Sequence, residues 1–366
     1  MQTHIEIADT RFLINGEPTY LGSAVEGLLF NVRTVNATFD DTLGKVTWFD
    51  DDGDREGNEH AGYGKWVSPE SADTNTTRYV EGLRSYREHG ILAVNLCFQG
   101  GHPLLGMPWI EEGAGSAGRR PNAHRDFYHN SVFRPDGSID YVGASRVARI
   151  IDGCDALGMV VLIQLFYFGQ DTVFEDETAI LNAADAAVDW ICGKGYTNVI
   201  VEIANEVMQG HFHHDILKPG RVADLIHRVR NRAREIHDTK LLVTTSEAAL
   251  LSDRQWQPAE IDKVFEASDF VIIHGGENVE TGKVGDSSQL VDKVKRIRSS
   301  GWFAAKQRPI ITNESEGEQA FDAMVNRGVS FGLHSTFFQT MFPPKWGVWE
   351  NDTTWFFDRV SHLTHP

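Results

Sequence analysis

Eight short apolar runs, separated by longer amphipathic segments, constrain the fold of this 366-residue chain more than any other feature of its sequence. Most of these runs are too short for helices and are rich in Val, Ile and Phe, which is typical of strands buried on both faces. The runs span residues 20–25, 91–98, 159–168, 199–204, 241–245, 270–274, 309–312 and 330–338. We therefore predict eight buried strands.

The segments between the runs have helical periodicity, and most of them end at a glycine. Tyr79, Leu83 and Tyr86, for example, fall on one helical face, and Gly90 follows them just before the second run. A glycine after the last periodic residue is a typical helix stop, because it adopts a left-handed conformation at little cost. The same pattern predicts helices that end at Gly158, Gly193, Gly301 and Gly328.

Eight strand–helix alternations without a break in composition predict a (β/α)8 barrel, formed as a single domain over residues 1–366. The alternative, an open doubly wound sheet, would carry a G-x-G-x-x-G phosphate turn, and the sequence has none. Residues 5–8 and 11–14, with Asn15-Gly16, predict a hairpin within residues 1–19 that closes the barrel floor. Long connections over residues 26–77 and 99–140 should wall a deep site at the active face.

Charge and hydropathy exclude several classes of partner. The chain has 34 Lys and Arg against 52 Asp and Glu, a formal net charge of −18, which disfavours binding to nucleic acid and to anionic membranes. No apolar stretch approaches the roughly 18–20 residues that span a bilayer. The first six residues lack the features of a signal peptide, so we expect a cytoplasmic protein unless a leader has been removed. The odd number and wide spacing of Cys97, Cys154 and Cys192 predict free, mostly buried thiols.

Two of the predicted strands end in an Asn-Glu pair. Asn205-Glu206 follows the fourth apolar run, and Asn313-Glu314 follows the seventh. The carboxyl ends of these strands face each other across the mouth of a closed barrel, so the two glutamates could approach to roughly 5–5.5 Å, as in a double-displacement glycosidase. That reaction needs one ionised carboxylate to attack the anomeric carbon and one protonated carboxyl group to release the leaving oxygen.

Three patches resemble the retaining glycoside hydrolases of clan A, and specifically their family 5, cellulase-like branch. The patches are residues 202–206 (EIANE), residues 309–314 (PIITNE) and residues 12–18 (FLINGEP). The resemblance implies that Glu206 is the acid/base, that Glu314 is the nucleophile and that Asn205 donates to the sugar 2-hydroxyl. It also implies an enzyme that uses neither a metal nor an organic cofactor.

The chain departs from the pattern of that clan in three places. Val207 follows the acid/base position, where clan members often have proline, and His274-Gly275-Gly276 has the histidine of the sixth strand without its usual tyrosine. The arginine that the clan carries near the second strand is not identified. The alternatives are that Glu206 and Glu314 are ordinary helix-start glutamates, or that Glu316, placed in the first turn of the next helix, is the nucleophile. We expect Glu202 to be a structural, hydrogen-bonded carboxylate below Glu206.

Further residues at the predicted rim suit a carbohydrate, because sugar C–H faces stack on aromatic rings and hydroxyl groups need polar partners. The candidates for substrate binding, beside Asn205, are His102, His274, Tyr167, Gln339, Trp346 and Trp349. A structural role is an equal alternative for His274.

The sequence thus predicts a retaining β-glycosidase for an oligosaccharide, and its long loops favour exo action. One alternative is a barrel that binds glycans without hydrolysing them. Another is a metal-dependent barrel hydrolase using the histidines of residues 211–214, although these have neither helical ligand spacing nor a cysteine partner. The sequence does not identify the sugar, the linkage or the oligomeric state.

Overall fold

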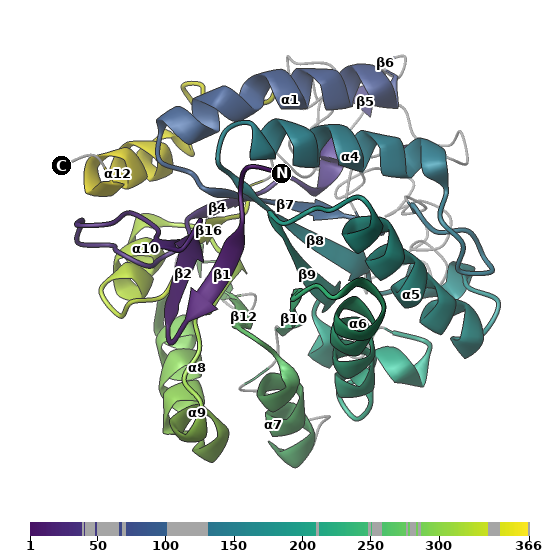
Figure 1. The fold of residues 1–366 in the computed structure, drawn as a ribbon. Coiled ribbons are helices and arrows are strands. Elements are labelled where there is room, and N and C mark those ends of the chain that lie inside the picture. The colour runs from purple at the N-terminus through teal and green to yellow at the C-terminus, as the bar shows by residue number, and fades with distance from the viewer. Residues whose placement is uncertain are drawn as a thin grey trace.

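A computed structural model of the chain describes residues 1–38, 40, 48–49, 66–67, 71–100, 131–209, 212–247, 250, 258–275, 277–278, 283–284, 287–335 and 345–364. Within these ranges, a parallel sheet has the strand order β10-β9-β8-β7-β4-β16 (Figure 1). Its strands are β4 (Asn31–Arg33), β7 (Ala93–Cys97), β8 (Val160–Phe166), β9 (Val199–Ala204), β10 (Leu242–Thr244) and β16 (Gly332–Leu333).

A second parallel sheet completes the barrel. It contains β11 (Ser246–Glu247), β12 (Val271–His274) and β15 (Ile310–Glu314). Thr245 alone separates β10 from β11, so the fifth barrel strand passes from one sheet to the other. On the other side, parallel bridges join Ile311 to Ser330 and Ser315 to Leu333, which connects β15 to β16. The described strands therefore form the predicted (β/α)8 barrel, with Glu206 after its fourth strand and Glu314 at the end of its seventh.

The prediction for the first strand is wrong, whereas the other seven apolar runs contain barrel strands. Residues 20–25 form turns, because Tyr20 and Gly22 have left-handed φ angles of 52° and 78° that no strand accommodates. The first barrel strand is instead β4, which ends at Arg33. The first long connection consequently begins after Arg33 and not at Glu26, and the side chain of Arg33 is fully buried.

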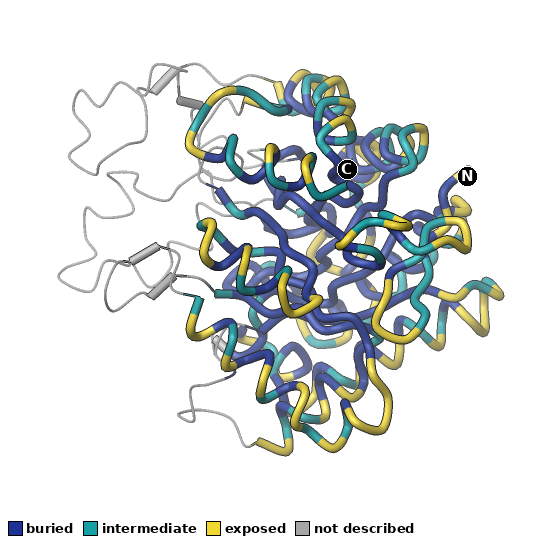
Figure 2. The backbone as a smooth tube through the Cα atoms, turned by 90° about the vertical axis from the view of Figure 1, so that its left-hand side faces the viewer, coloured by how far each residue is buried: buried dark blue, intermediate teal, exposed yellow. Residues whose placement is uncertain are grey.

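Helices surround the strands, and their buried sides face the barrel (Figures 1 and 2). They are α1 (Ala72–Glu88), α4 (Tyr141–Asp155), α5 (Glu177–Gly193), α6 (Val222–His237), α7 (Pro258–Ala267), α8 (Ser287–Ser299), α9 (Gly301–Ala305), α10 (Glu318–Val325) and α12 (Thr354–Thr364). The predicted stops at Gly90, Gly158 and Gly328 are confirmed by left-handed φ angles of 81°, 69° and 63°.

The helix stop predicted at Gly193 is confirmed, because Gly193 is the last residue of α5, although the left-handed turn that follows is made by Gly195, with a φ of 71°. The stop predicted at Gly301 is wrong. Gly301 begins α9 and does not end α8, because the Ser300 hydroxyl accepts the N–H of Phe303 as an N-cap.

The N-terminal hairpin lies at the amino ends of the barrel strands. Strand β1 (Ile5–Ala8) pairs antiparallel with β2 (Arg11–Ile14), and β3 (Glu17–Pro18) follows. Ile5 and Phe12 are buried with residues from the start of several strands, and the Phe12 ring meets Phe270 edge-to-face at 5.8 Å. The hairpin therefore packs at the amino ends of the strands, opposite the ends that carry Glu206 and Glu314.

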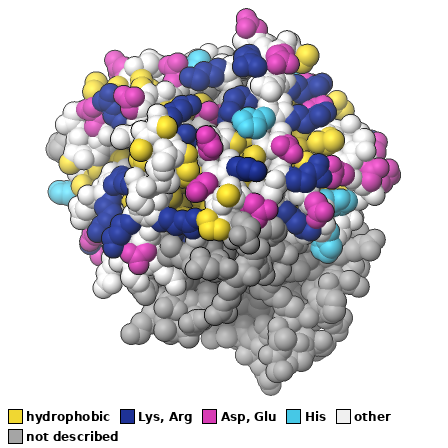
Figure 3. Space-filling view, turned by 90° about the horizontal axis from the view of Figure 1, so that it is seen from below, with side chains coloured by type: hydrophobic (Ala, Val, Ile, Leu, Met, Phe, Trp, Pro, Cys, Tyr) yellow, Lys and Arg dark blue, Asp and Glu magenta, His cyan; other side chains and the backbone are white. Residues whose placement is uncertain are grey.

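Two further expectations concern the thiols and the surface. Cys97 and Cys154 are buried free thiols, and Cys192 is a half-buried one. In the described ranges, no helix combines the length and hydropathy that crossing a bilayer requires. On the coloured part of the face seen in Figure 3, basic and acidic side chains are interspersed.

Candidate active site

The two predicted glutamates lie together at the carboxyl ends of β9 and β15. Glu314 is the last residue of β15, and Glu206 follows β9 with a left-handed φ of 51°. One carboxylate oxygen of each glutamate and a ring nitrogen of His274 all lie within 4.8 Å of one another. The side chains of Glu206 and Glu314 are 15% and 17% exposed, so both remain accessible from the barrel mouth.

His274 lies between the two carboxylates. Its Nδ1 is 3.0 Å from Glu206 Oε1 and 3.3 Å from Glu314 Oε2. Burial alone would lower the pKa of His274, but the negative charges of Glu314 and Glu206 outweigh burial and raise it. The ring is therefore poised to carry a proton at Nδ1. In the described part of the chain, its buried Nε2 has no hydrogen-bond partner.

Arg33 is a residue of the candidate site that the sequence reasoning missed. Its Nη2 is 2.7 Å from Glu314 Oε1 and also donates to Asn205 Oδ1 at 3.0 Å. Burial would lower the pKa of Arg33, yet the neighbouring charges, Glu314 first, raise it above its ordinary value. The sequence does hold a signal, since Arg33 follows residues 28–32 (LLFNV), which are apolar except for Asn31. Assigning the first strand to residues 20–25 concealed it.

A bulge in β15 allows consecutive residues to reach the barrel interior. Ile273 pairs with Thr312, and the next residue, His274, pairs with Glu314, so Asn313 is the extra residue. Regular alternation would direct Asn313 away from the side that Glu314 faces. Instead, Asn313 Nδ2 donates to Glu202 Oε2 at 3.3 Å. Glu202 is fully buried, and burial raises its pKa, which fits the expected structural role.

Asn205 and Tyr167 both lie close to Arg33, but their surroundings differ. Asn205 is fully buried, and its Nδ2 has no hydrogen-bond partner among the described residues. Tyr167 is 3% exposed, and its ring centroid is 4.4 Å from that of Phe168. Tyr167 is therefore a buried aromatic side chain beside the site and not an open stacking platform.

The two predicted rim tryptophans have different surroundings. Trp346 donates from Nε1 to Asn75 Oδ1 at 2.8 Å, and its ring meets Tyr79 edge-to-face at 4.8 Å, which packs it against α1. Trp349 donates to the carbonyl of Lys345 at 3.2 Å, and the Lys345 ammonium lies 4.9 Å from the centre of its ring, so these contacts lie within its own segment. The other two rim candidates, His102 and Gln339, lie outside the described residues.

Glu316, the rival nucleophile, is not in the first turn of a helix as predicted. It precedes α10, and its carboxylate forms an ion pair with His334 at 3.7 Å. Burial would lower the pKa of His334, but Glu316 and the charge of Glu314 raise it. Glu314 is therefore the acidic residue of this segment that meets Arg33 and His274. His334, just after β16, is a second neighbour of the site that sequence reasoning missed.

Of the histidines after the fourth strand, His213 and His214 are held by Asp171, and His211 lies outside the described residues. The main-chain N–H groups of His213 and His214 donate to Asp171 Oδ2 at 2.7 and 3.0 Å, and His213 Nδ1 lies 3.3 Å from Asp171 Oδ1. Throughout the described ranges, the group of donors close enough to share an ion is Glu206, His274 and Glu314. Arg33 already places a positive charge 2.7 Å from Glu314, which disfavours a second cation there.

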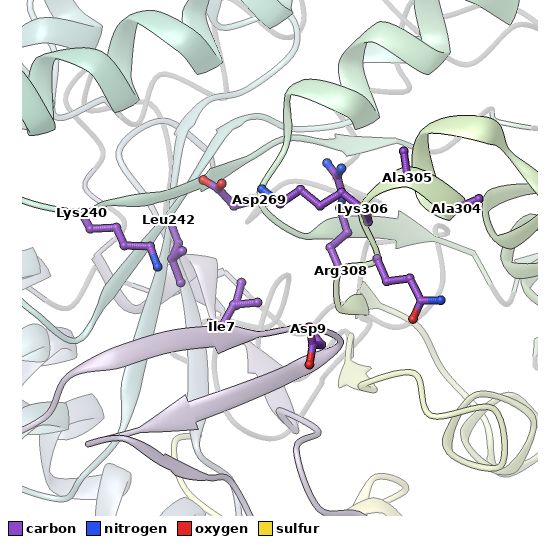
Figure 4. A pocket seen from close by; sticks show the side chains of 10 residues that line it. Ile7, Asp9, Lys240, Leu242, Asp269, Ala304, Ala305, Lys306 and Arg308 are labelled. Carbon is purple, nitrogen blue, oxygen red and sulfur yellow. The ribbon is translucent and has the colours of Figure 1, made fainter.

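A separate cavity of about 670 Å³ lies at the barrel floor (Figure 4). Ile7 and Asp9 of the hairpin region line it on one side, and Lys240, Lys306 and Arg308 line it on the other. Because the cavity is at the amino ends of the strands, it is distinct from the glutamate pair.

Comparisons with known proteins agree with this architecture. No protein-family model matches the sequence, and no curated protein matches it. Among solved structures, the chain is similar to a β-mannanase from the blue mussel Mytilus edulis, with 11% identity, a TM-score of 0.54 and coverage of 100% of this chain and 97% of that one. An endo-1,4-β-mannanase from Rhizomucor miehei has 11% identity, a TM-score of 0.55 and 99% coverage of both chains. A family 5 mannosidase from Rhizomucor miehei has 15% identity, a TM-score of 0.54 and coverage of 99% and 98%. The chain therefore has the (β/α)8 barrel fold of family 5 glycoside hydrolases.

Proposed function

We propose that this protein is a retaining β-glycosidase. The observation that carries the proposal is the approach of Glu206 and Glu314, whose carboxylate oxygens lie within 4.8 Å at the barrel mouth. Retaining enzymes hold their two carboxyl groups about 5–5.5 Å apart, whereas inverting enzymes leave roughly 6.5–9.5 Å for a water molecule. The short separation supports double displacement.

The surroundings of the two glutamates support different roles. The buried Arg33 guanidinium, 2.7 Å from Glu314, stabilises the carboxylate anion that a nucleophile requires. Glu314 attacks the anomeric carbon and forms a glycosyl ester, while Glu206 gives its proton to the departing oxygen. Glu206 then takes a proton from the incoming water, which attacks the same carbon and releases the sugar with its original configuration.

Asn205 is suited to hold the sugar that reacts. Its Oδ1 is fixed by Arg33, and its buried Nδ2 lacks a hydrogen-bond partner within the described structure. An unpaired buried donor costs about 1–3 kcal/mol, which a ligand oxygen would recover. A hydrogen bond from Asn205 to the 2-hydroxyl, strengthening in the transition state, would use this donor.

The similar structures and the long loops support a choice of substrates to test. Similar solved structures include mannanases and a mannosidase, so β-mannosides are the first substrates to examine, followed by β-glucosides. The long connections after the first and second barrel strands support a closed site, and hence exo action on the end of an oligosaccharide.

The test combines a panel of aryl glycosides with a mechanism-based label. Proton NMR of the first-formed anomer should show retention, and a 2-deoxy-2-fluoro glycoside should label the peptide that contains Glu314. Glu314→Gln is the control that should take no label. An active enzyme labelled elsewhere, or one that inverts configuration, would contradict the proposal. Binding without turnover would favour the glycan-binding alternative, and loss of activity on chelation would favour the metal-dependent one.

A further inference from the structure

The two-residue strand β11 lies directly behind the glutamate pair. Ser246 and Glu247 are both fully buried and pair in parallel with Ile272 and Ile273 of β12. The Ser246 hydroxyl accepts the main-chain N–H of Glu206 at 2.9 Å. This bond falls at the residue whose left-handed backbone turns its carboxylate toward the barrel mouth. Strand β11 therefore contacts the backbone of one of the two site glutamates.

The second connection from β11 reaches His274. Strand β12 ends at His274, and Gly275 follows it with a φ of 135°. The carbonyl of His274 is instead bonded by Lys293 Nζ, which reaches from α8 and lies 2.6 Å away. Lys293 also forms an ion pair with Glu247 Oε1 at 2.9 Å, and Glu247 Oε2 accepts the N–H of Leu250 at 2.7 Å.

The burial of this ion pair indicates a purpose other than stability. The side chain of Lys293 is 3% exposed and that of Glu247 is fully buried. Removing two charges from water costs free energy that their attraction only partly offsets, and an apolar pair of similar volume is often at least as stable. What an apolar pair lacks is a directed donor for the His274 carbonyl.

We propose that Ser246, Glu247 and Lys293 are positioning residues that fix Glu206 and His274 relative to each other. Ser246 holds the backbone of Glu206, and the Glu247–Lys293 pair holds the backbone of His274. The bond of 3.0 Å between His274 Nδ1 and Glu206 Oε1 depends on both. The kinetic consequences rest on the glycosidase function proposed above. A misplacement of about 1 Å can reduce a rate about 100-fold.

The central experiment replaces the pair with apolar residues, in Lys293→Met and in the double variant Lys293→Met/Glu247→Met. The single variant leaves the buried Glu247 carboxylate without its cation, and we expect it to lower both Tm and kcat. The double variant should recover most of the Tm, yet keep kcat about 10- to 100-fold below the parent with KM changed less than about twofold. The matched control is Lys295→Met, on the same helix but 69% exposed, which should change neither quantity.

A readout that does not depend on catalysis separates the two proposals. The imidazole nitrogen shifts of His274, measured by NMR, should change in the double variant and remain unchanged in Lys295→Met. Wild-type kcat together with wild-type His274 shifts in the folded double variant would overturn the positioning role. Ser246→Ala, which removes a single hydroxyl group, provides the same test if the double variant does not fold. A parent protein without glycosidase activity would refute the proposed function, while the His274 shifts would still test the positioning.

Discussion

Two groups of ion pairs, one on the helical layer and one inside the barrel, use the same residue types in different ways. Between α5 and α6, Arg221, Arg228 and Arg232 pair with Glu177, Asp185 and Asp189, and the side chains are 17–45% exposed. Each guanidinium donates to both oxygens of a carboxylate, so both oxygens of each carboxylate are hydrogen-bonded within the pair.

The inner group is buried, and several of its polar atoms lack a hydrogen-bond partner within the described residues. Arg33 is fully buried beside Glu314, and its Nε and Nη1 join Asn205 Nδ2 and His274 Nε2 among the buried atoms of the described structure that lack a partner. A buried polar atom without a partner is unfavourable for folding, and it is also what a bound ligand can use. The helical pairs therefore serve the fold, whereas the inner group retains hydrogen-bonding capacity that the proposed substrate would use.

The largest effect should come from the glutamates themselves. Glu206→Gln removes the proton donor, so kcat should fall about 10²- to 10⁴-fold on a glycoside with a poor leaving group. The loss should be smaller on a dinitrophenyl glycoside, whose leaving group needs no proton. Glu314→Gln should abolish turnover of both. Equal losses on the two substrates in Glu206→Gln would contradict its role as the acid.

The next effect separates the two groups by stability. Arg33→Met leaves the Glu314 carboxylate without its buried partner, so the free energy of unfolding should fall by about 3–5 kcal/mol. Arg228→Met, in the helical group, should cost only about 0.2–1 kcal/mol, because Arg228 is 42% exposed and Asp185 keeps its bond from Arg232. Urea unfolding at pH 7 measures both values. Similar losses in the two variants would remove the distinction between the groups.

The pH dependence of stability should have opposite signs in the two groups. The raised pKa of His274 means that its contribution is complete below the unfolded value of about 6.5 and is lost as pH rises through the folded value. The lowered pKa of Asp189, caused first by its bond from Arg232, gives a contribution that is lost as pH falls through its folded value. Urea unfolding from pH 6 to 9 should show a decline in the parent that His274→Asn reduces. An unchanged slope would contradict the assignment.

The smallest effect concerns salt. Asp185→Ala removes the partner of Arg228. The resulting loss in the free energy of unfolding should be smaller in 1 M NaCl, where the screening length is about 3 Å, than at low salt. The loss caused by Arg33→Met should persist, because solvent ions do not screen a fully buried guanidinium. Unfolding curves at low and high salt provide the comparison, and a salt-independent loss in Asp185→Ala would mean that the pair is less solvated than its exposure indicates.

The sequence predicts the barrel and the glutamate pair because both depend on local patterns. An apolar run followed by Asn-Glu predicts a glutamate at the end of a strand without any information about distant residues. Arg33 and His334 were missed because each acquires its role from a partner on another strand, which appears only when the barrel closes. Trp346 was instead assigned to the site on its residue type alone. A tryptophan suits a sugar platform and core packing equally, and the contact with Asn75 is what indicates packing.

The bulge in β15 makes the length of a strand as important as its residues. Asn313 is the additional residue between the partners of Ile273 and His274. In a regular ladder Asn313 would lie opposite His274, and Glu314 would turn toward the helices. The bulge instead keeps Glu314 opposite His274. A single irregular position thus lets one strand supply both the carboxylate at the mouth and the amide that bonds Glu202 beneath it.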